Sequence, residues 1–286
     1  MSAKVVSSFF TSEAEPAEPH NSNENGSPSD VSDHFLHIID ELNLSLEEFQ
    51  MPKKVKCVYN PTIYARHTFE MYARKYCNTT KHIMYLGMNP GPYGMSQTDW
   101  LGIQGPVGKP PIELKKRNVT GFNCPRKEVN NNNVAHSYLK LCHSCCMYGQ
   151  RFWGLFRDIC KTPENFFETS FVYNYLNQQW MKDDGANITP SDFNVSEMEP
   201  LYNMCDPALI KVLELYEVEK IVAIGRFCET RAQKAIEKYG SRKSIEIFYL
   251  PHPSPRVVHN QDWDEKAKDH LKKYNLLKYY MKQLPT

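Results

Sequence analysis

Apolar residues recur along this chain with two different spacings, and the change between them predicts alternating elements. Residues 35–49 (FLHIIDELNLSLEEF) and 64–77 (YARHTFEMYARKYC) place apolar side chains three and four positions apart, as amphipathic helices do. Four shorter runs are almost continuously apolar, which is typical of strands covered on both faces. These runs are Ile83–Met88, Phe171–Tyr175, Lys220–Gly225 and Ile245–Leu250.

Helical patterns lie between these runs and after the last one. They cover Arg151–Lys161, Pro207–Tyr216, Phe227–Tyr239 and a basic segment, Trp263–Gln283. Strands that alternate with helices predict a parallel sheet with helices on both of its faces. We therefore expect an α/β fold.

The beginning of the chain has a different composition. Residues 7–33 are rich in Ser, Glu, Asn and Pro and lack aromatic residues after Phe10, so this segment has too little apolar surface to order itself. We predict a disordered N-terminal tail over residues 1–33 and one folded domain over residues 34–286. A total of 286 residues is compatible with one large domain or two small ones.

Composition limits the class of protein without identifying a partner. The 34 Lys and Arg nearly balance the 33 Asp and Glu, so any affinity for DNA must come from local basic clusters. No run approaches the ~18 apolar residues of a membrane span, and we expect no membrane association. The nine cysteines are scattered, which favours free thiols in a reducing, intracellular compartment.

Candidate chemistry gathers where the four apolar runs end. In open parallel sheets the ligand site lies beyond the carboxyl ends of the strands. The first run leads into GMNPGPYGM (residues 87–95), the second ends at Asn174, the third leads into Gly225-Arg226, and the fourth leads into PHPSPR (residues 251–256). Polar and rigid residues from distant segments are thus expected at one edge of the sheet.

Three side chains in these loops are candidates for a functional role. Prolines fix φ and glycines permit a close backbone approach, so the loops can hold Asn89 and His252 stiffly. The amide of Asn174 can read the donor and acceptor edge of a base. Each residue also has an ordinary interpretation: Asn89 as a turn former, His252 as a structural histidine, and Asn174 as a cap of the next turn.

The combination of motifs is more specific than any single residue. GMNPGPYGM after one strand, FVYN in another and HPSPR after the last resemble the single-strand-selective monofunctional uracil-DNA glycosylases. The resemblance extends to PRKEV (125–129), RFWGLF (151–156) and IGRFCETRA (224–232). It implies a three-layer α/β/α sandwich around a four-stranded parallel sheet, which is the uracil-DNA glycosylase fold.

The resemblance also implies an activity and a set of site residues. The activity is hydrolysis of the N-glycosidic bond of uracil, and of oxidised pyrimidines such as 5-hydroxymethyluracil, in single- and double-stranded DNA, leaving an abasic site. Asn89 matches the residue that positions the attacking water, His252 the one that stabilises negative charge on uracil O2, and Asn174 the one that bonds the uracil edge. The expected substrate-binding residues are Met88, Gly91, Tyr93, Met95 and Asn174.

The proposed chemistry agrees with the residue types present. An asparagine is no strong base, so catalysis must rely on stabilising the leaving uracil anion while water is held in place. Neither loop motif contains a lysine that could form a Schiff base with the sugar, which fits a monofunctional enzyme. We expect no cofactor.

A DNA-binding face is expected around the same loops. The segment from Ser254 to Asp262 would supply the wedge that fills the duplex gap. Basic residues near the site would clamp phosphates, although ordinary solvated charge is the alternative for about half of them. The expected DNA-binding residues are Ser254, Pro255, Arg256, Lys127 and Arg151, and further candidates are Lys109, Lys115, Lys116, Arg117 and Arg126. We expect a nuclear monomer, with the nuclear location following from the resemblance.

The chain departs from the family pattern in three places. Residues 97–102 (QTDWLG) lack the segment that carries the base-stacking aromatic residue, and Asn177 stands where a proline is expected. An insertion, Asn130–Gln150, contains a cluster of His and Cys without the paired ligand spacing of a structural zinc site, so we expect no metal. The alternatives are therefore a catalytically impaired isoform or a DNA-binding protein that retains the fold, and, in another class, a small-molecule enzyme such as a nucleotide hydrolase.

Overall fold

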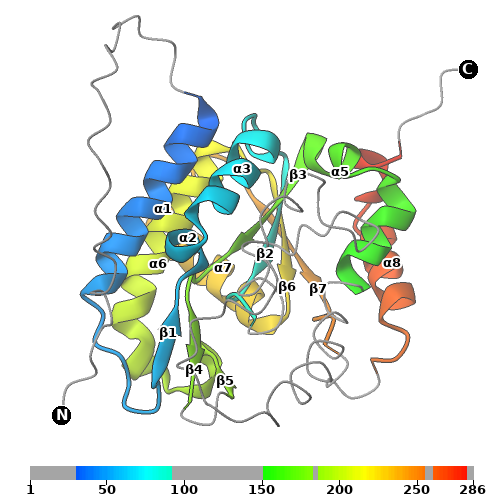
Figure 1. Ribbon diagram of the computed structural model, residues 1–286. Coiled ribbons are helices and arrows are strands. Elements are labelled where there is room, and N and C mark those ends of the chain that lie inside the picture. The colour runs from blue at the N-terminus through cyan, green and yellow to red at the C-terminus, as the bar shows by residue number, and fades with distance from the viewer. Residues whose placement is uncertain (1–29, 92–150, 183–185, 255–259, 282–286) are drawn as a thin grey trace, which may run out of the picture.

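A four-stranded parallel sheet forms the centre of the computed structural model, which describes residues 30–91, 151–182, 186–254 and 260–281. The strands are β2 (Ile83–Gly87), β3 (Ser170–Asn174), β6 (Lys220–Ile224) and β7 (Glu246–Leu250), in the order β3-β2-β6-β7. All three neighbouring pairs are parallel, and the arrowheads in Figure 1 point to the same end. The four predicted strands are thereby confirmed, each to within one residue at either end.

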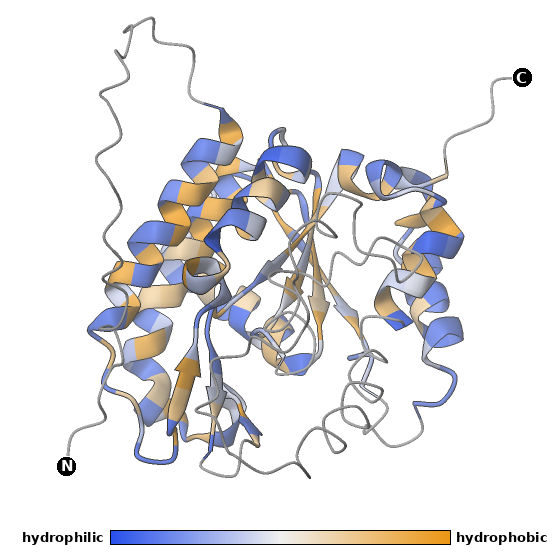
Figure 2. Ribbon diagram, in the orientation of Figure 1, coloured by the Kyte–Doolittle hydropathy of each residue, from blue (hydrophilic) through white to orange (hydrophobic). Residues whose placement is uncertain are grey.

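Helices cover both faces of this sheet, which completes the α/β/α sandwich and confirms the fold class (Figure 1). On one face lie α1 (Val31–Glu47) and α6 (Val195–Leu215), where Phe35 and Tyr216 contact the strand residues Tyr173 and Phe171. On the other face Tyr85 of β2 packs against aromatic rings from the helix at 151–160 and from α5 (Pro163–Thr169). Hydrophobic colour accordingly follows the strands and the inner sides of the helices in Figure 2.

The remaining helices follow from local signals. Helix α3 (Arg66–Tyr76) comes after a single helical turn, α2 (Pro61–Tyr64). The pattern at 64–77 predicts one helix, whereas this stretch contains the last residue of α2 and the whole of α3. Helix α7 (Arg226–Tyr239) confirms the pattern at 227–239. Helix α1 begins at Val31 because Asp30 caps it, so residues 31–33 of the predicted tail are helical.

Two helix predictions need correction. Helix α6 starts twelve residues before the predicted Pro207, at Val195, since Asn194 and Glu197 form a capping box and burial of residues such as Leu201 outweighs the cost of two internal prolines. Helix α8 (Trp263–Lys273) ends well before Gln283. There Asn275 adopts a left-handed φ of 54°, and the Leu276 amide bonds back to Leu271.

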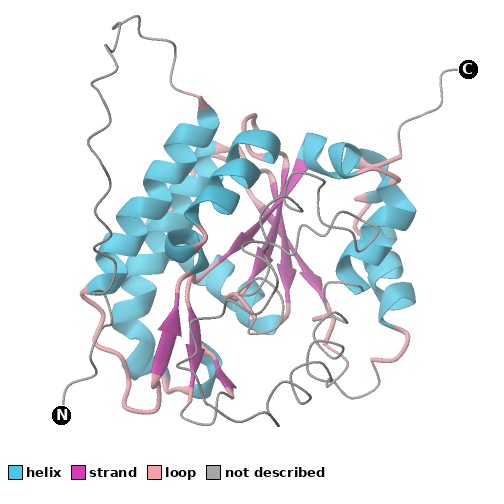
Figure 3. Ribbon diagram, in the orientation of Figure 1, coloured by secondary structure: helices cyan, strands magenta, loops and turns pink. Residues whose placement is uncertain are grey.

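A second, smaller sheet is absent from the sequence-based expectations. Strands β1 (Cys57–Tyr59), β4 (Gln179–Met181) and β5 (Asn187–Ile188) pair antiparallel in the order β1-β4-β5 (Figure 3). The short 3-10 helix η2 (Pro190–Asp192) follows β5, and another, η3 (Leu277–Tyr279), follows α8. Because β4 comes directly after the loop that follows β3, this small sheet lies beside the carboxyl edge of the main one.

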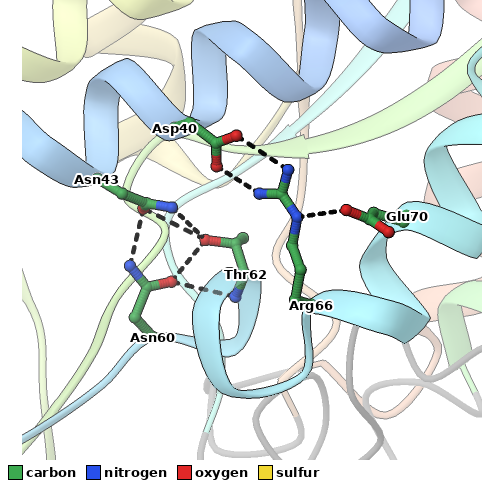
Figure 4. A network of polar contacts seen from close by, with 6 residues as sticks. All are labelled: Asp40, Asn43, Asn60, Thr62, Arg66 and Glu70. Atoms are coloured by element: carbon green, nitrogen blue, oxygen red, sulfur yellow. Dashed lines mark hydrogen bonds and ion pairs between the residues drawn. The ribbon is translucent and has the colours of Figure 1, made fainter. Parts of the chain in front are cut away.

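A polar network fixes α1 to the α2–α3 segment. The Asn43 side chain donates to Thr62 across 2.9 Å, and the guanidinium of Arg66 bonds both Asp40 and Glu70. Its members are Asp40, Asn43, Asn60, Thr62, Arg66 and Glu70 (Figure 4). The network ties the first helix of the domain to the rest of the fold.

In the stretches that the structure describes, no helix is both long and apolar enough to cross a bilayer. The five cysteines in those stretches are free thiols, and four of them are buried.

Candidate active site

The four strand ends bring the predicted residues to a single edge of the sheet. Asn174 ends β3, Asn89 lies two residues beyond β2, Gly225 follows β6 and His252 lies two residues beyond β7. Neighbouring strands are about 4.8 Å apart, so the strands that carry Asn89 and His252 are separated by roughly 10 Å, with β6 between them.

The side chain of Asn89 is held by two main-chain carbonyls. Its Nδ2 donates to the oxygen of Pro90 at 3.3 Å and to that of Gln178 at 3.4 Å. Carbonyl oxygens only accept, so these contacts fix which end of the amide is nitrogen. The Oδ1 of Asn89 accepts no hydrogen bond from the described residues and is thereby available to a water molecule.

Asn174 lies directly over Gly87, its partner in the parallel register. A Cβ atom at Gly87 would stand 2.5 Å from Oδ1 of Asn174, closer than any real contact, so only glycine fits there. The buried Asn174 side chain is 2 % exposed. The loop beyond it is fastened to the neighbouring strand because the amides of Tyr175 and Leu176 donate to the carbonyls of Gly87 and Met88, each at 2.9 Å.

Met88, Pro90 and Gly91 are the other described residues of the first loop. Met88 is partly buried, and its sulfur accepts a hydrogen bond from Ser191 of η2 at 3.5 Å. Pro90 is buried and Gly91 partly so. The small sheet and η2 therefore support the residue expected to line the pocket.

His252 has a defined tautomer. The backbone amide of Ser254 donates to its Nδ1 at 3.2 Å, so Nδ1 is an acceptor and the proton of the neutral ring lies on Nε2. Desolvation lowers the pKa of His252 below its usual 6.5, which keeps the ring neutral at pH 7. The residue nevertheless counts as exposed, so the ring is surrounded by protein atoms yet reachable from solvent.

The loop that carries His252 is clamped from three sides. Nδ2 of the buried Asn260 donates to the carbonyls of His252 at 3.0 Å and Ser254 at 2.7 Å. The indole of Trp263 donates to Pro251 at 2.8 Å, and Arg151 donates to Pro253 at 3.3 Å. These contacts, more than the flanking prolines alone, set the direction of the imidazole.

Several predicted residues have a different or an undescribed environment. Ser254 is 8 % exposed and uses its backbone inside the loop, and Arg151 supports that loop, so both serve the site internally whatever they do with DNA. The other predicted residues lie outside the described part of the chain. They are Tyr93, Met95, Pro255, Arg256, Lys127, Lys109, Lys115, Lys116, Arg117 and Arg126, together with the QTDWLG segment and the insertion at 130–150.

Sequence reasoning missed the residues that position the site rather than form it. Gly87 stands inside the quoted motif, but its contact with Asn174 depends on the strand register. Asn260 and Gln178 act through long-range contacts for which the sequence carries no periodic signal. Within the described residues, no three His, Cys, Asp or Glu side chains are grouped so that they could hold a metal ion.

The arrangement can polarise a leaving group and orient a water. It offers an amide oxygen as an acceptor, a neutral imidazole as a donor through Nε2 and, at Asn174, a buried amide at the neighbouring strand end. None of these groups is a strong base or a nucleophile. Such a set suits a bond that breaks mainly by departure of a stabilised anion.

Comparisons with known proteins agree with this chemistry. No family model matches the chain. It is 36 % identical over 259 residues to "Single-strand selective monofunctional uracil DNA glycosylase" of Mus musculus, with 86 % of each chain covered. It is 36 % identical over 263 residues to the Bos taurus protein of the same name, covering 88 % of this chain and 89 % of the relative.

Similarity to a solved structure supports the fold. The crystal structure of wild-type Pedobacter heparinus SMUG2 superposes with a TM-score of 0.51, covering 85 % of this chain and 98 % of that one. The sequence identity is only 15 %, so this likeness concerns the fold alone.

Proposed function

Because the chain belongs to the single-strand-selective monofunctional uracil-DNA glycosylases, we propose that it hydrolyses the N-glycosidic bond of uracil in DNA and leaves an abasic site. One observation supports this chemistry most directly. Asn89 and His252 stand at the same sheet edge, and the main chain fixes both the amide and the ring in one orientation.

The nucleotide must first leave the base stack, at a cost of about a few kcal/mol, before C1′ can be reached. As the bond to the base stretches, the sugar takes on oxocarbenium character. Asn89 would hold the attacking water through Oδ1, since its Nδ2 is already committed to Pro90 and Gln178. The amide need not remove a proton, because water attacks a strongly electrophilic carbon.

His252 would act on the leaving group. Negative charge grows on uracil O2 as the bond breaks, and a neutral imidazole donor at Nε2 stabilises it most when the charge is largest. The lowered pKa keeps the imidazole neutral before the substrate binds, so the empty site needs no negative charge to balance it. Asn174, buried over Gly87, would bond the edge of the base.

The proposal has finer parts that rest on the family resemblance of the motifs. We propose that oxidised pyrimidines such as 5-hydroxymethyluracil are also substrates, and that both single- and double-stranded DNA are accepted. We further propose that the protein works as a nuclear monomer.

Release of uracil from an end-labelled oligonucleotide, followed by alkaline cleavage at the abasic site, tests the proposal. Single- and double-stranded oligonucleotides with uracil or 5-hydroxymethyluracil would separate the finer parts. A gel shift on abasic-site DNA runs in parallel. Binding without release would favour the non-enzymatic alternative, and equal cleavage of free deoxyuridine would favour a small-molecule enzyme.

A further inference from the structure

A buried ion pair lies behind the base-reading edge of the site. Asp206 of α6 and Arg231 of α7 are joined by a hydrogen-bonded ion pair, with their side chains 1 % and 9 % exposed. Replacing such a pair by apolar residues is often neutral or stabilising, so stability alone is a weak reason for its presence. Its position suggests another reason.

The pair reaches the site through Tyr175, the residue next to Asn174. The phenol of Tyr175 donates to Oδ1 of Asp206 at 2.6 Å, while its backbone amide donates to the Gly87 carbonyl at 2.9 Å. Tyr175 is therefore held at both ends, by the neighbouring strand and by the ion pair. Because Asn174 is its direct chain neighbour, the course of the backbone at Asn174 depends on these bonds.

Helix α7 links this network to the opposite side of the site. Phe227 packs edge-on against Tyr175 at a centroid distance of 5.8 Å, and the guanidinium of Arg231 lies 3.9 Å from the Tyr202 ring centroid. The helix begins immediately after Gly225, which has a φ of 90°. A Cβ there would lie 3.7 Å from Cβ of His252, so the start of α7 packs against the catalytic histidine.

We infer that Tyr175, Asp206 and Arg231 are positioning residues, which hold the base-reading Asn174 in register with His252 through α7. The inference rests on the proposed role of Asn174 in bonding the uracil edge. The bonds from Tyr175 to Asp206 and from Asp206 to Arg231 involve charged partners, which makes them stronger and more directional than neutral ones. Without them the end of β3 keeps its sheet partner but loses its outer support.

The test compares two tyrosines that are two residues apart. Tyr175→Phe removes the hydroxyl that bonds Asp206, whereas Tyr173→Phe removes a buried hydroxyl that has no hydrogen-bond partner in the described structure. The readout is the inhibition constant of free uracil against excision from a single-stranded oligonucleotide. This constant does not depend on the fraction of folded enzyme, so a merely structural defect leaves it unchanged.

We expect Tyr175→Phe to raise the inhibition constant by about tenfold, which corresponds to about 1.4 kcal/mol, and Tyr173→Phe to leave it at the wild-type value. Asn174→Ala serves as the reference and should abolish inhibition. If Asn174→Ala has that effect and Tyr175→Phe does not change the constant, the positioning inference is wrong and the proposed function stands. A wild-type constant in Asn174→Ala would instead contradict the role of Asn174, and with it the inference.

Discussion

The backbone amide of Ser254 donates a hydrogen bond to Nδ1 of His252 over 3.2 Å. This contact leaves Nε2 as the donor of the neutral ring. Protonation at Nδ1 would convert this acceptor into a donor that faces the N–H of Ser254, so the imidazolium cation is incompatible with the bond. The bond from Ser254 therefore fixes the tautomer of His252 together with the conformation of its loop.

The first prediction concerns pH. Desolvation places the pKa of His252 below 6.5, so single-turnover excision should be constant from pH 8 down to about 6.5 and fall only at lower pH. The same residue affects stability. Between pH 6.5 and the lower pKa of the folded state, His252 is protonated in the unfolded chain but not in the folded protein. The free energy of unfolding therefore decreases as pH falls through this window and levels off below it.

A histidine away from the sheet edge provides the control for this profile. His270 of α8 also has a lowered pKa, caused first by desolvation and then by the charge of Lys273. His270→Gln should alter the pH dependence of unfolding and leave the acid limb of the excision rate in place. Loss of that limb in His270→Gln, or its persistence in His252→Gln, would contradict the assignment.

The second prediction concerns the two reacting contacts. Asn89→Ala and His252→Ala should each slow single-turnover excision of uracil by at least ~100-fold, the scale of losing one transition-state donor or acceptor. Asn203, an exposed residue whose side chain bonds Lys238, supplies the control Asn203→Ala with an unchanged rate. Wild-type rates in both site variants would place the chemistry elsewhere.

The third prediction concerns Gly87. In Gly87→Ala the new methyl group would stand 2.5 Å from Oδ1 of Asn174, which must move away. We expect excision to fall by at least ~10-fold and the free energy of unfolding to drop by about 1–3 kcal/mol, as in other overpacked sites.

Gly154 offers the matched substitution for Gly87→Ala. It lies in the helix at 151–160, and no atom stands within 4 Å of an added Cβ. Gly154→Ala should retain activity and raise stability by about 0.5–1 kcal/mol. Equal excision rates in the two alanine variants would show that Asn174 tolerates displacement.

The fourth prediction concerns the clamp on the histidine loop. Asn260→Ala leaves the carbonyls of His252 and Ser254 without their shared donor, at a cost of about 1–3 kcal/mol. Excision should slow by about 10-fold, less than in His252→Ala, because the imidazole is still present but its orientation is no longer fixed by Asn260. Rate and thermal midpoint measured together check this, and an unchanged rate with a lowered midpoint would limit Asn260 to stability.

The sequence predicts the main sheet closely because three of its strands, β2, β3 and β6, are mostly buried along their length. Runs such as 83–88 and 220–225 are almost continuously apolar and too short for a typical helix. The small sheet escapes this reasoning since Gln179 is buried despite its polar side chain, and β5 has only two residues. The first part of helix α6, before Pro207, escapes it because Pro200 and Pro207 interrupt the local pattern, whereas tertiary packing keeps the helix continuous.

The candidate site likewise contains residues that the sequence predicts and residues that it does not. Asn89 and His252 stand in loops whose proline and glycine content is visible in the sequence. Two of their supports are not visible there, because Gln178 and Asn260 act through hydrogen bonds that only the folded chain brings together. The residue types that perform chemistry can be recognised locally, whereas the groups that aim them depend on register and loop course.

Strand β7, which delivers His252, is an edge strand of the parallel sheet and the last of its four strands to be synthesised. A ribosome-bound nascent chain will have made Asn89 and Asn174 long before the histidine exists. It therefore contains the proposed water-holding and base-reading residues before the residue that is proposed to stabilise the departing anion. Excision of the base is accordingly expected only after β7 has paired with β6.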